Sequence, residues 1–274
     1  MGSAGDARLL ADAFRHFGWV ARDAVWDTIQ PDGTPVLIRH TWDYHRRLDE
    51  FIGWIDGLEA GGTPVHDPPR WLRWNVDKRY LEDLADYGIA VPPTAYLAAG
   101  DAIPDEAELR ERLGGQRFVV KPTIAATAWR TSLVDAGDPD ALTRAVLDAS
   151  REAEVMIQRF VPEVATGEWS LVYLGGELSH TVLKRAKAGD FRVQKDFGGT
   201  VELVTPPEAA VETAERALAF LEEPVAYARV DGILTDEGFQ LMELELIEPD
   251  LFLGMVPESA RRLAGWVVDR LTGG

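Results

Sequence analysis

The 274-residue sequence contains no cysteine, which excludes disulfide bonds, thiolate nucleophiles and thiolate metal ligands. It also lacks any apolar run that approaches the roughly 18 residues of a transmembrane helix. The first residues include early acidic side chains and no apolar segment of the kind that secretory signals require. We therefore expect a cytoplasmic protein with no membrane partner.

Positive charge is scarce: 28 Lys and Arg stand against 46 Asp and Glu, a net charge of −18 at pH 7. This balance disfavours nucleic acid and anionic membranes as partners, although a local lysine and arginine cluster could still bind an anionic ligand. The acidic excess alone indicates solubility and no particular function. The apolar fraction of 46% and the length predict a globular chain with one large domain or two to three lobes.

The first 70 residues predict a small α/β lobe that opens on a helix and not on a strand. Apolar residues recur at helical spacing over residues 6–18, and Thr34–His40 reads as a short buried strand. A second helix is expected from about Tyr44 to Leu58, where two glycines follow. We place this N-terminal lobe at residues 1–70.

Two hairpin signals mark the second half of the chain. One surrounds Gly175 and Gly176, and the other turns at residues 235–238, TDEG. Because helices and strands are interspersed, we predict an α/β (α+β) fold with mixed sheets. The helices expected between and after these strands cover residues 138–151, 207–221 and 258–271.

The second hairpin brings three carboxylates together. Glu243 and Glu245 share one face of a strand, ~6.6 Å apart, and Asp231 on the neighbouring strand can face either of them. Burying like charges without a partner is costly, so a cation must lie between them. Carboxylate oxygens suit Mg²⁺ or Mn²⁺, and Arg229 on the same face can contact an anion bound there. The alternative is a ladder of arginine–glutamate ion pairs on a solvated face.

Lys121 has an unusual position for a lysine. It ends the apolar stretch Phe118–Val120 and precedes a proline, so we expect a packed stem and an ammonium group that points into a cleft. A lone lysine such as Lys78 is normally a solvated surface charge.

Three residues that follow the strand of the first lobe are candidate substrate contacts. Arg39, Trp42 and Tyr44 come at the carboxyl end of that strand, where α/β folds bind ligands. For Trp42, packing between lobes is an alternative interpretation.

Six segments occur in the order and spacing of an ATP-grasp ligase. They span roughly residues 71–271, and they are WNVDKRYLEDLADYGIAVPPT, FVVKP, MIQRFVPEVATGEWSL, GDFRVQ, ARVDGIL and MELELIEP. The chain thus resembles the family of D-alanine–D-alanine ligase, glutathione synthetase and the RimK-type ligases. It is most similar to the branch that forms D-cycloserine, which shares R-x-TWDY and ELELIEP.

The resemblance implies the ATP-grasp fold, in which two mixed or antiparallel sheets clasp ATP. The ATP-grasp domain would span residues 71–274, with a lid subdomain at about 90–160 and a metal-binding core at about 161–274. Two Mg²⁺ (or Mn²⁺) ions would be held by Asp231, Glu243 and Glu245. The implied nucleotide-binding residues are Lys78 and Lys121 for the phosphates, Gln158, Arg159, Phe160 and Val161 for adenine, and Glu168 for ribose. The implied catalytic residues are Arg229 for the attacked acyl group and Arg192 for the γ-phosphate.

Such ligases phosphorylate a carboxylate and let an amine displace the phosphate, so a small carboxylate and an amine are the implied substrates, and a homodimer is possible. Two alternatives stay open: ATP-driven ring closure as in cycloserine formation, and a non-catalytic ATP-binding sensor or scaffold. The chain also departs from the family pattern. Glu245 stands where asparagine is common, and the loop TIAATAWRTS after Lys121 has no glycine.

Overall fold

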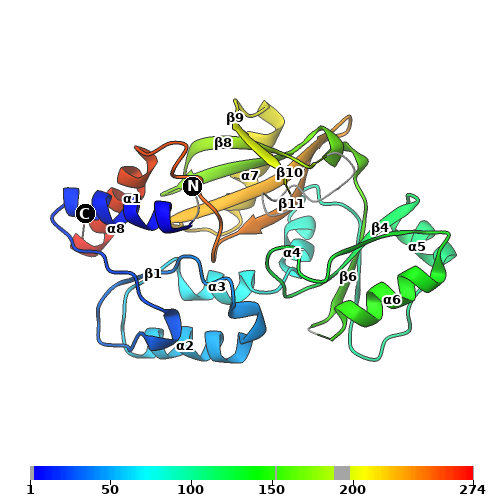
Figure 1. The fold of residues 1–274 in the computed structure, drawn as a ribbon, viewed down its shortest axis with the longest axis horizontal. Helices are drawn as coiled ribbons and strands as arrows, with labels where there is room; N and C mark the ends of the chain where they lie inside the picture. Colours follow the sequence, from blue (N-terminus) through cyan, green and yellow to red (C-terminus); the bar gives the residue numbers. More distant parts are fainter. Residues whose placement is uncertain (1–2, 152, 188–197, 274) are drawn as a thin grey trace.

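The computed structural model of the protein describes residues 3–151, 153–187 and 198–273 (Figure 1). Two antiparallel sheets form its frame. The strand order is β11-β10-β7-β8-β9 in the five-stranded sheet and β3-β6-β4-β5 in the four-stranded sheet. The strands are β3 (Thr94–Leu97), β4 (Arg117–Pro122), β5 (Ser132–Asp135), β6 (Val155–Arg159), β7 (Glu168–Leu174), β8 (Glu177–Arg185), β9 (Thr200–Leu203), β10 (Tyr227–Thr235) and β11 (Gly238–Glu245).

Both predicted hairpins are confirmed. Strands β7 and β8 are joined through Gly175 and Gly176, whose φ angles of 63° and 83° fall in the region that favours glycine. A Cβ atom on Gly175 would lie 2.3 Å from Cδ1 of Trp266, so no larger residue fits this turn. Strands β10 and β11 meet at the second turn, where Thr235 pairs with Gly238.

Helices cover both sheets. On the four-stranded sheet, α6 begins at Pro139, and the Asp138 carboxylate caps it by accepting a hydrogen bond from the Ala141 amide at 2.8 Å. On the five-stranded sheet, α7 packs through fully buried alanines on one of its faces, and these small side chains let the helix approach the strands closely. The helices of this part are α4 (Tyr80–Asp86), α5 (Glu106–Leu113), α6 (Pro139–Ala149) and α7 (Glu208–Ala219), with the 3₁₀ turn η3 (Pro162–Thr166).

The first helix belongs to a different layer from the rest of the N-terminal segment. Helix α1 (Ser3–His16) packs beside the last helix, α8 (Ser259–Thr272), and Leu10 and Phe14 share a buried cluster with Leu263 (Figure 1). Among the described residues, no helix has the length and apolar character needed to cross a bilayer.

The remaining N-terminal elements surround a second core, which contains Trp26 and Phe51. In this part of the chain, the structure differs from two of the sequence predictions. The expected strand at Thr34–His40 keeps only two residues, because the chain leaves its single parallel partner and turns at His40, where φ is 52°. The helix expected from Tyr44 begins later because Arg47 adopts non-helical angles. The elements are η1 (Trp26–Thr28), β1 (Val36–Leu37), η2 (Tyr44–Arg46), α2 (Leu48–Ala60), β2 (Val65–His66) and α3 (Pro69–Asn75).

Candidate active site

A cavity of about 440 Å³ lies between the two sheets and the N-terminal segment. Residues of β4 and β6 line one side, and residues of β7, β8, β10 and β11 line the other. The loop that follows β4 and residues 40–44 complete the wall. This volume lies within the range of small-molecule sites.

The predicted carboxylate trio lies in this cavity. Asp231 on β10 pairs directly with Glu243 on β11, and Arg229 pairs with Glu245. One oxygen of each carboxylate lies within 4.8 Å of the other two. The register shifts after Asp231, at Gly232, where a Cβ atom would lie 2.3 Å from the Phe239 ring. Glycine at 232 therefore lets the bulge form beside the acidic residue.

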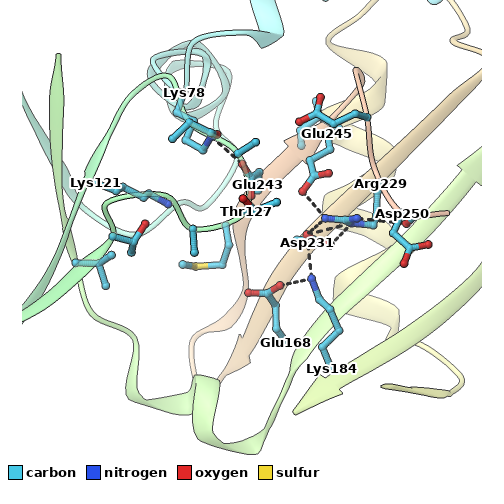
Figure 2. A pocket seen from close by; sticks show the side chains of 18 of the residues that line it. Lys78, Lys121, Thr127, Glu168, Lys184, Arg229, Asp231, Glu243, Glu245 and Asp250 are labelled. Atoms are coloured by element: carbon cyan, nitrogen blue, oxygen red, sulfur yellow. Dashed lines mark hydrogen bonds and ion pairs between the residues drawn. The ribbon is translucent and has the colours of Figure 1, made fainter. Parts of the chain in front are cut away.

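Positive side chains from several elements surround the trio (Figure 2). Lys78 Nζ lies 3.2 Å from a carboxylate oxygen of Glu243 and donates a hydrogen bond to the carbonyl of Ala125 at 2.6 Å. Arg229 contacts Asp231 at 2.8 Å and also pairs with Glu245. The carboxylates are thus neutralised by side chains in the protein as it stands.

Lys184, on β8, is a second buried cation at this end of the cavity. Its Nζ lies 2.5 Å from Glu168 and 3.1 Å from Asp231, and the Ser170 hydroxyl donates to Asp231 at 2.5 Å. The sequence reasoning missed Lys184. Counting residues outward from Gly175 and Gly176 would place Leu183 opposite Glu168; a register shift between Val172 and Tyr173 brings Lys184 there instead.

Lys78 and Lys121 determine the ionisation of Glu243. Burial opposes its charged form, but Lys78 and Lys121 outweigh burial and hold the pKa of Glu243 below its ordinary value. Burial and the nearby Lys78 charge in turn lower the pKa of Lys121, although Glu243 opposes this shift. Lys121 lines the cavity, as its place at the end of an apolar strand predicted.

The other two carboxylates have opposite pKa shifts. Burial would raise the pKa of Asp231, but Arg229 and Lys184 outweigh it and hold this pKa well below its ordinary value. Burial raises the pKa of Glu245 to about 7; Arg229 opposes the shift, and the charges of Glu243 and Asp231 add to it. Of the three carboxylates, Glu245 is therefore the one whose charged form a further positive charge would stabilise most.

The donor set fits a magnesium ion. Three carboxylates within one small volume supply the hard oxygen ligands that Mg²⁺ prefers. A divalent cation would also relieve the repulsion that raises the pKa of Glu245.

Apart from Arg192, the cavity also gathers the residues that the resemblance assigned to the nucleotide: Lys78, Lys121, Gln158, Arg159, Phe160, Val161 and Glu168. The Gln158 amide donates to the Thr94 hydroxyl at 3.2 Å, whereas its buried oxygen has no partner among the described residues. Burial raises the pKa of Glu168, and Lys184 opposes that shift.

The candidate substrate residues divide into two groups. Trp42 and Tyr44 line the cavity. Arg39 does not line it: its guanidinium stacks on the Tyr227 ring at 4.7 Å and donates to the carbonyl of Pro249 at 2.9 Å. Arg192, the other expected catalytic arginine, lies outside the described residues.

Two antiparallel sheets that enclose a cavity lined by acidic and basic residues are the architecture of an ATP-grasp ligase. A model of the N-terminal domain of D-cycloserine synthetase DcsG matches residues 2–67. The cycloserine biosynthesis protein DcsG of Streptomyces lavendulae is 30% identical over 96% of this chain and 92% of its own length. The crystal structure of D-cycloserine synthetase DcsG superposes with a TM-score of 0.86 at 27% identity, covering 97% of this chain and 95% of that one. The chain therefore belongs to the ATP-grasp superfamily, in the family of DcsG.

It is an ATP-grasp carboxylate–amine ligase. The ligase PsnB, solved with Mg and ADP, has a TM-score of 0.62 over 97% of this chain and 95% of its own, at 17% identity, which demonstrates the shared fold alone. ATP-grasp relatives thus bind Mg and adenine nucleotide.

Proposed function

We propose that this enzyme uses ATP to phosphorylate a substrate carboxylate and forms an amide-like bond to an amine, with Mg²⁺ held by Asp231, Glu243 and Glu245. One observation carries this proposal: Asp231 and Glu243 are paired in register, and the trio adjoins two cavity-lining lysines, Lys78 and Lys121. A pure binding protein has no need for an arginine beside this trio, and Arg229 lies there.

The nucleotide would occupy the side of the cavity formed by β4, β6 and β7. Lys78 and Lys121 would hold the phosphates, the chain from Gln158 to Val161 would hold adenine, and Glu168 would accept hydrogen bonds from the ribose hydroxyls. In this assignment residues 90–160 form the lid subdomain, residues 161–274 form the metal-binding core, and residues 1–70 form the N-terminal lobe.

The reaction follows in two balanced steps. The substrate carboxylate attacks the γ-phosphorus, and the bond from that phosphorus to the ADP oxygen breaks. The amine nitrogen then attacks the acyl carbon, the carbon–oxygen bond to phosphate breaks, and the nitrogen loses a proton. Arg229 would hold the negative acyl oxygen as this charge develops. Magnesium, when bound, would neutralise charge on the phosphoryl group.

Ring closure within one molecule is the second candidate. It is favoured by the 30% identity to a cycloserine biosynthesis protein across nearly the whole of both chains. In that case the carboxylate and the attacking nitrogen belong to the same substrate.

A screen of ADP and phosphate release tests both versions. The purified enzyme is incubated with ATP, Mg²⁺ and a library of amino acids and their derivatives, singly and in pairs. Release that needs two acids and yields their condensation product supports intermolecular ligation. Release with one acid, and a product lighter by one water, supports ring closure. ADP binding without release for any acid would favour the sensor, and the absence of stabilisation by ATP would remove the nucleotide site altogether.

A further inference from the structure

Among the described residues, one carboxylate in the cavity has neither a hydrogen-bond partner nor an ion-pair partner. Six acidic residues line the cavity, and five of them have a partner: Glu168, Asp231, Glu243 and Glu245 pair with cations, and Asp250 accepts a hydrogen bond from the Phe252 amide at 2.8 Å. Glu248 is the sixth. Within residues 3–151, 153–187 and 198–273, its carboxylate makes no hydrogen bond or ion pair.

The nearest cations are already engaged elsewhere. Lys78 binds Glu243 and a backbone carbonyl, and Arg229 binds Asp231 and Glu245. Burial and the charges of Glu245 and Glu243 raise the pKa of Glu248 well above its ordinary value. An unpaired carboxylate in this position is costly, and a cation that enters the cavity would remove the cost.

Neutral aromatic groups form the wall beside Glu248. The Trp42 indole N–H donates to the Glu248 carbonyl at 3.2 Å, and the His40 ring lies 5.2 Å from Trp42. Burial and Arg39 lower the pKa of His40 to about 4, so this imidazole adds no positive charge at neutral pH. Tyr44 lines the same cavity as Trp42 and Glu248, and burial together with the nearby charge of Glu248 raises the pKa of Tyr44 well above its ordinary value. A cavity that offers aromatic rings and a carboxylate suits a cationic nitrogen.

We propose that Glu248, with Trp42 and Tyr44, forms a subsite that binds a positively charged nitrogen of the substrate. This inference rests on the proposed function and assigns the recognition of a substrate ammonium group to a particular residue, Glu248. Glu248 acts as a specificity-determining residue, and it does so without holding the metal or the nucleotide.

The test measures binding, so it does not require the true substrate. Thermal unfolding and calorimetry are recorded with Mg²⁺ and a non-hydrolysable ATP analogue. Each probe is an amino acid paired with its deaminated acid: D- and L-alanine with propionate, and D- and L-serine with 3-hydroxypropionate. We expect an amino acid to bind the wild type more tightly than its partner. In Glu248→Gln, the affinity for the amino acid should fall by roughly 10- to 100-fold, and the affinity for the deaminated acid should stay unchanged.

The matched control is Asp250→Asn, which neutralises a carboxylate in the same cavity that already has a hydrogen-bond partner. It should keep the preference for the amino acid. The inference is overturned if no amino acid is preferred over its deaminated partner, or if the preference survives in Glu248→Gln. The second result would mean that Glu248 is protonated and neutral, because glutamine is then its equal. Stabilisation by MgADP separates the two proposals: its absence would overturn the nucleotide site itself.

Discussion

Replacing Glu243 with glutamine removes the carboxylate of the trio that pairs with Lys78. At 3.2 Å, the Lys78–Glu243 charge pair amounts to about 5 kcal/mol at an effective dielectric constant of about 20, and much of this is offset by desolvation. Breaking a fully buried pair by removing one partner costs about 3–5 kcal/mol. The Glu243 side chain is 30% exposed, so we expect a net loss of about 2 kcal/mol, or about 4–8 °C in Tm for a chain of this size.

The effect on catalysis should be much larger than the effect on binding. We expect ADP formation to fall by roughly 1000-fold, the upper end of the range for losing one preorganised electrostatic contact. The affinity for MgADP should fall by less than about 10-fold, because Lys121 and the residues on β6 and β7 that line the rest of the cavity are unchanged. Coupled ADP detection with an active acid, calorimetry with MgADP and thermal unfolding measure the three quantities.

Glu154→Gln is the matched control. Glu154 also pairs with a cation, Arg79, at 2.5 Å, but both side chains are 38% exposed and neither lines the cavity. This variant should change stability by no more than about 0.5 kcal/mol and should keep full turnover. Turnover of Glu243→Gln within 10-fold of the wild type would refute the role that we assign to Glu243.

Three further predictions concern other parts of the structure. Lys184→Met leaves two buried carboxylates without their shared cation; we expect a loss of about 3 kcal/mol in unfolding free energy and at least 10-fold weaker MgADP binding by calorimetry. Tyr227→Phe removes the hydroxyl that lies between the carbonyl oxygens of Ile38 and Ile247, at a cost of about 1–2 kcal/mol in chemical denaturation. His40 has a folded pKa of about 4 against 6.5 unfolded, so the unfolded chain takes up the proton first and stability falls between pH 6.5 and pH 4. Partial exposure limits this loss to about 1 kcal/mol; His40→Asn, which tolerates the positive φ, should flatten the profile by that amount.

For each of these variants, one result would contradict the reasoning behind the prediction. Lys184→Arg keeps the positive charge and should retain most of the MgADP affinity. If its MgADP affinity falls as far as that of the methionine variant, the shape of the side chain and not its charge explains the loss. An unchanged denaturation midpoint in Tyr227→Phe would mean that water replaces the hydroxyl. An unaltered pH profile in His40→Asn would assign the acid sensitivity to other groups.

The hairpins could be predicted because their determinants are local. Gly175 with Gly176 and the turn at residues 235–238 each predict which strands pair, but a register shift between Asp231 and Gly232, and not the turn alone, brings Asp231 opposite Glu243. A two-residue alternation then places Glu245 on the same face. The placement of the three carboxylates on neighbouring strands could therefore be predicted from the order of the residues, whereas the sequence could show neither the bulge that sets Asp231 opposite Glu243 nor the cations that neutralise the trio.

The parts that escaped prediction depend on contacts between distant segments. Helix α1 packs beside α8 because apolar side chains of both helices share one buried cluster with residues of the five-stranded sheet, and no local signal states this pairing. Arg39 was expected in the cavity from its place after a strand, yet Tyr227, nearly two hundred residues away, offers its ring instead. Lys184 was overlooked because its two partners lie on different strands.

The origin of the cations explains how folding and catalysis are linked in this enzyme. The trio comes from one hairpin, but Lys78 precedes α4, Lys121 is the penultimate residue of β4 and Lys184 lies on β8. A shift of one residue in the β10–β11 register would turn the carboxylates to the opposite face, away from all of these lysines. Only the assembled fold thus balances the charge. ATP and magnesium would then enter a site in which Lys78, released from Glu243 by the metal, has a phosphate to bind, so that charge is exchanged within the cavity and little solvent reorganisation is needed.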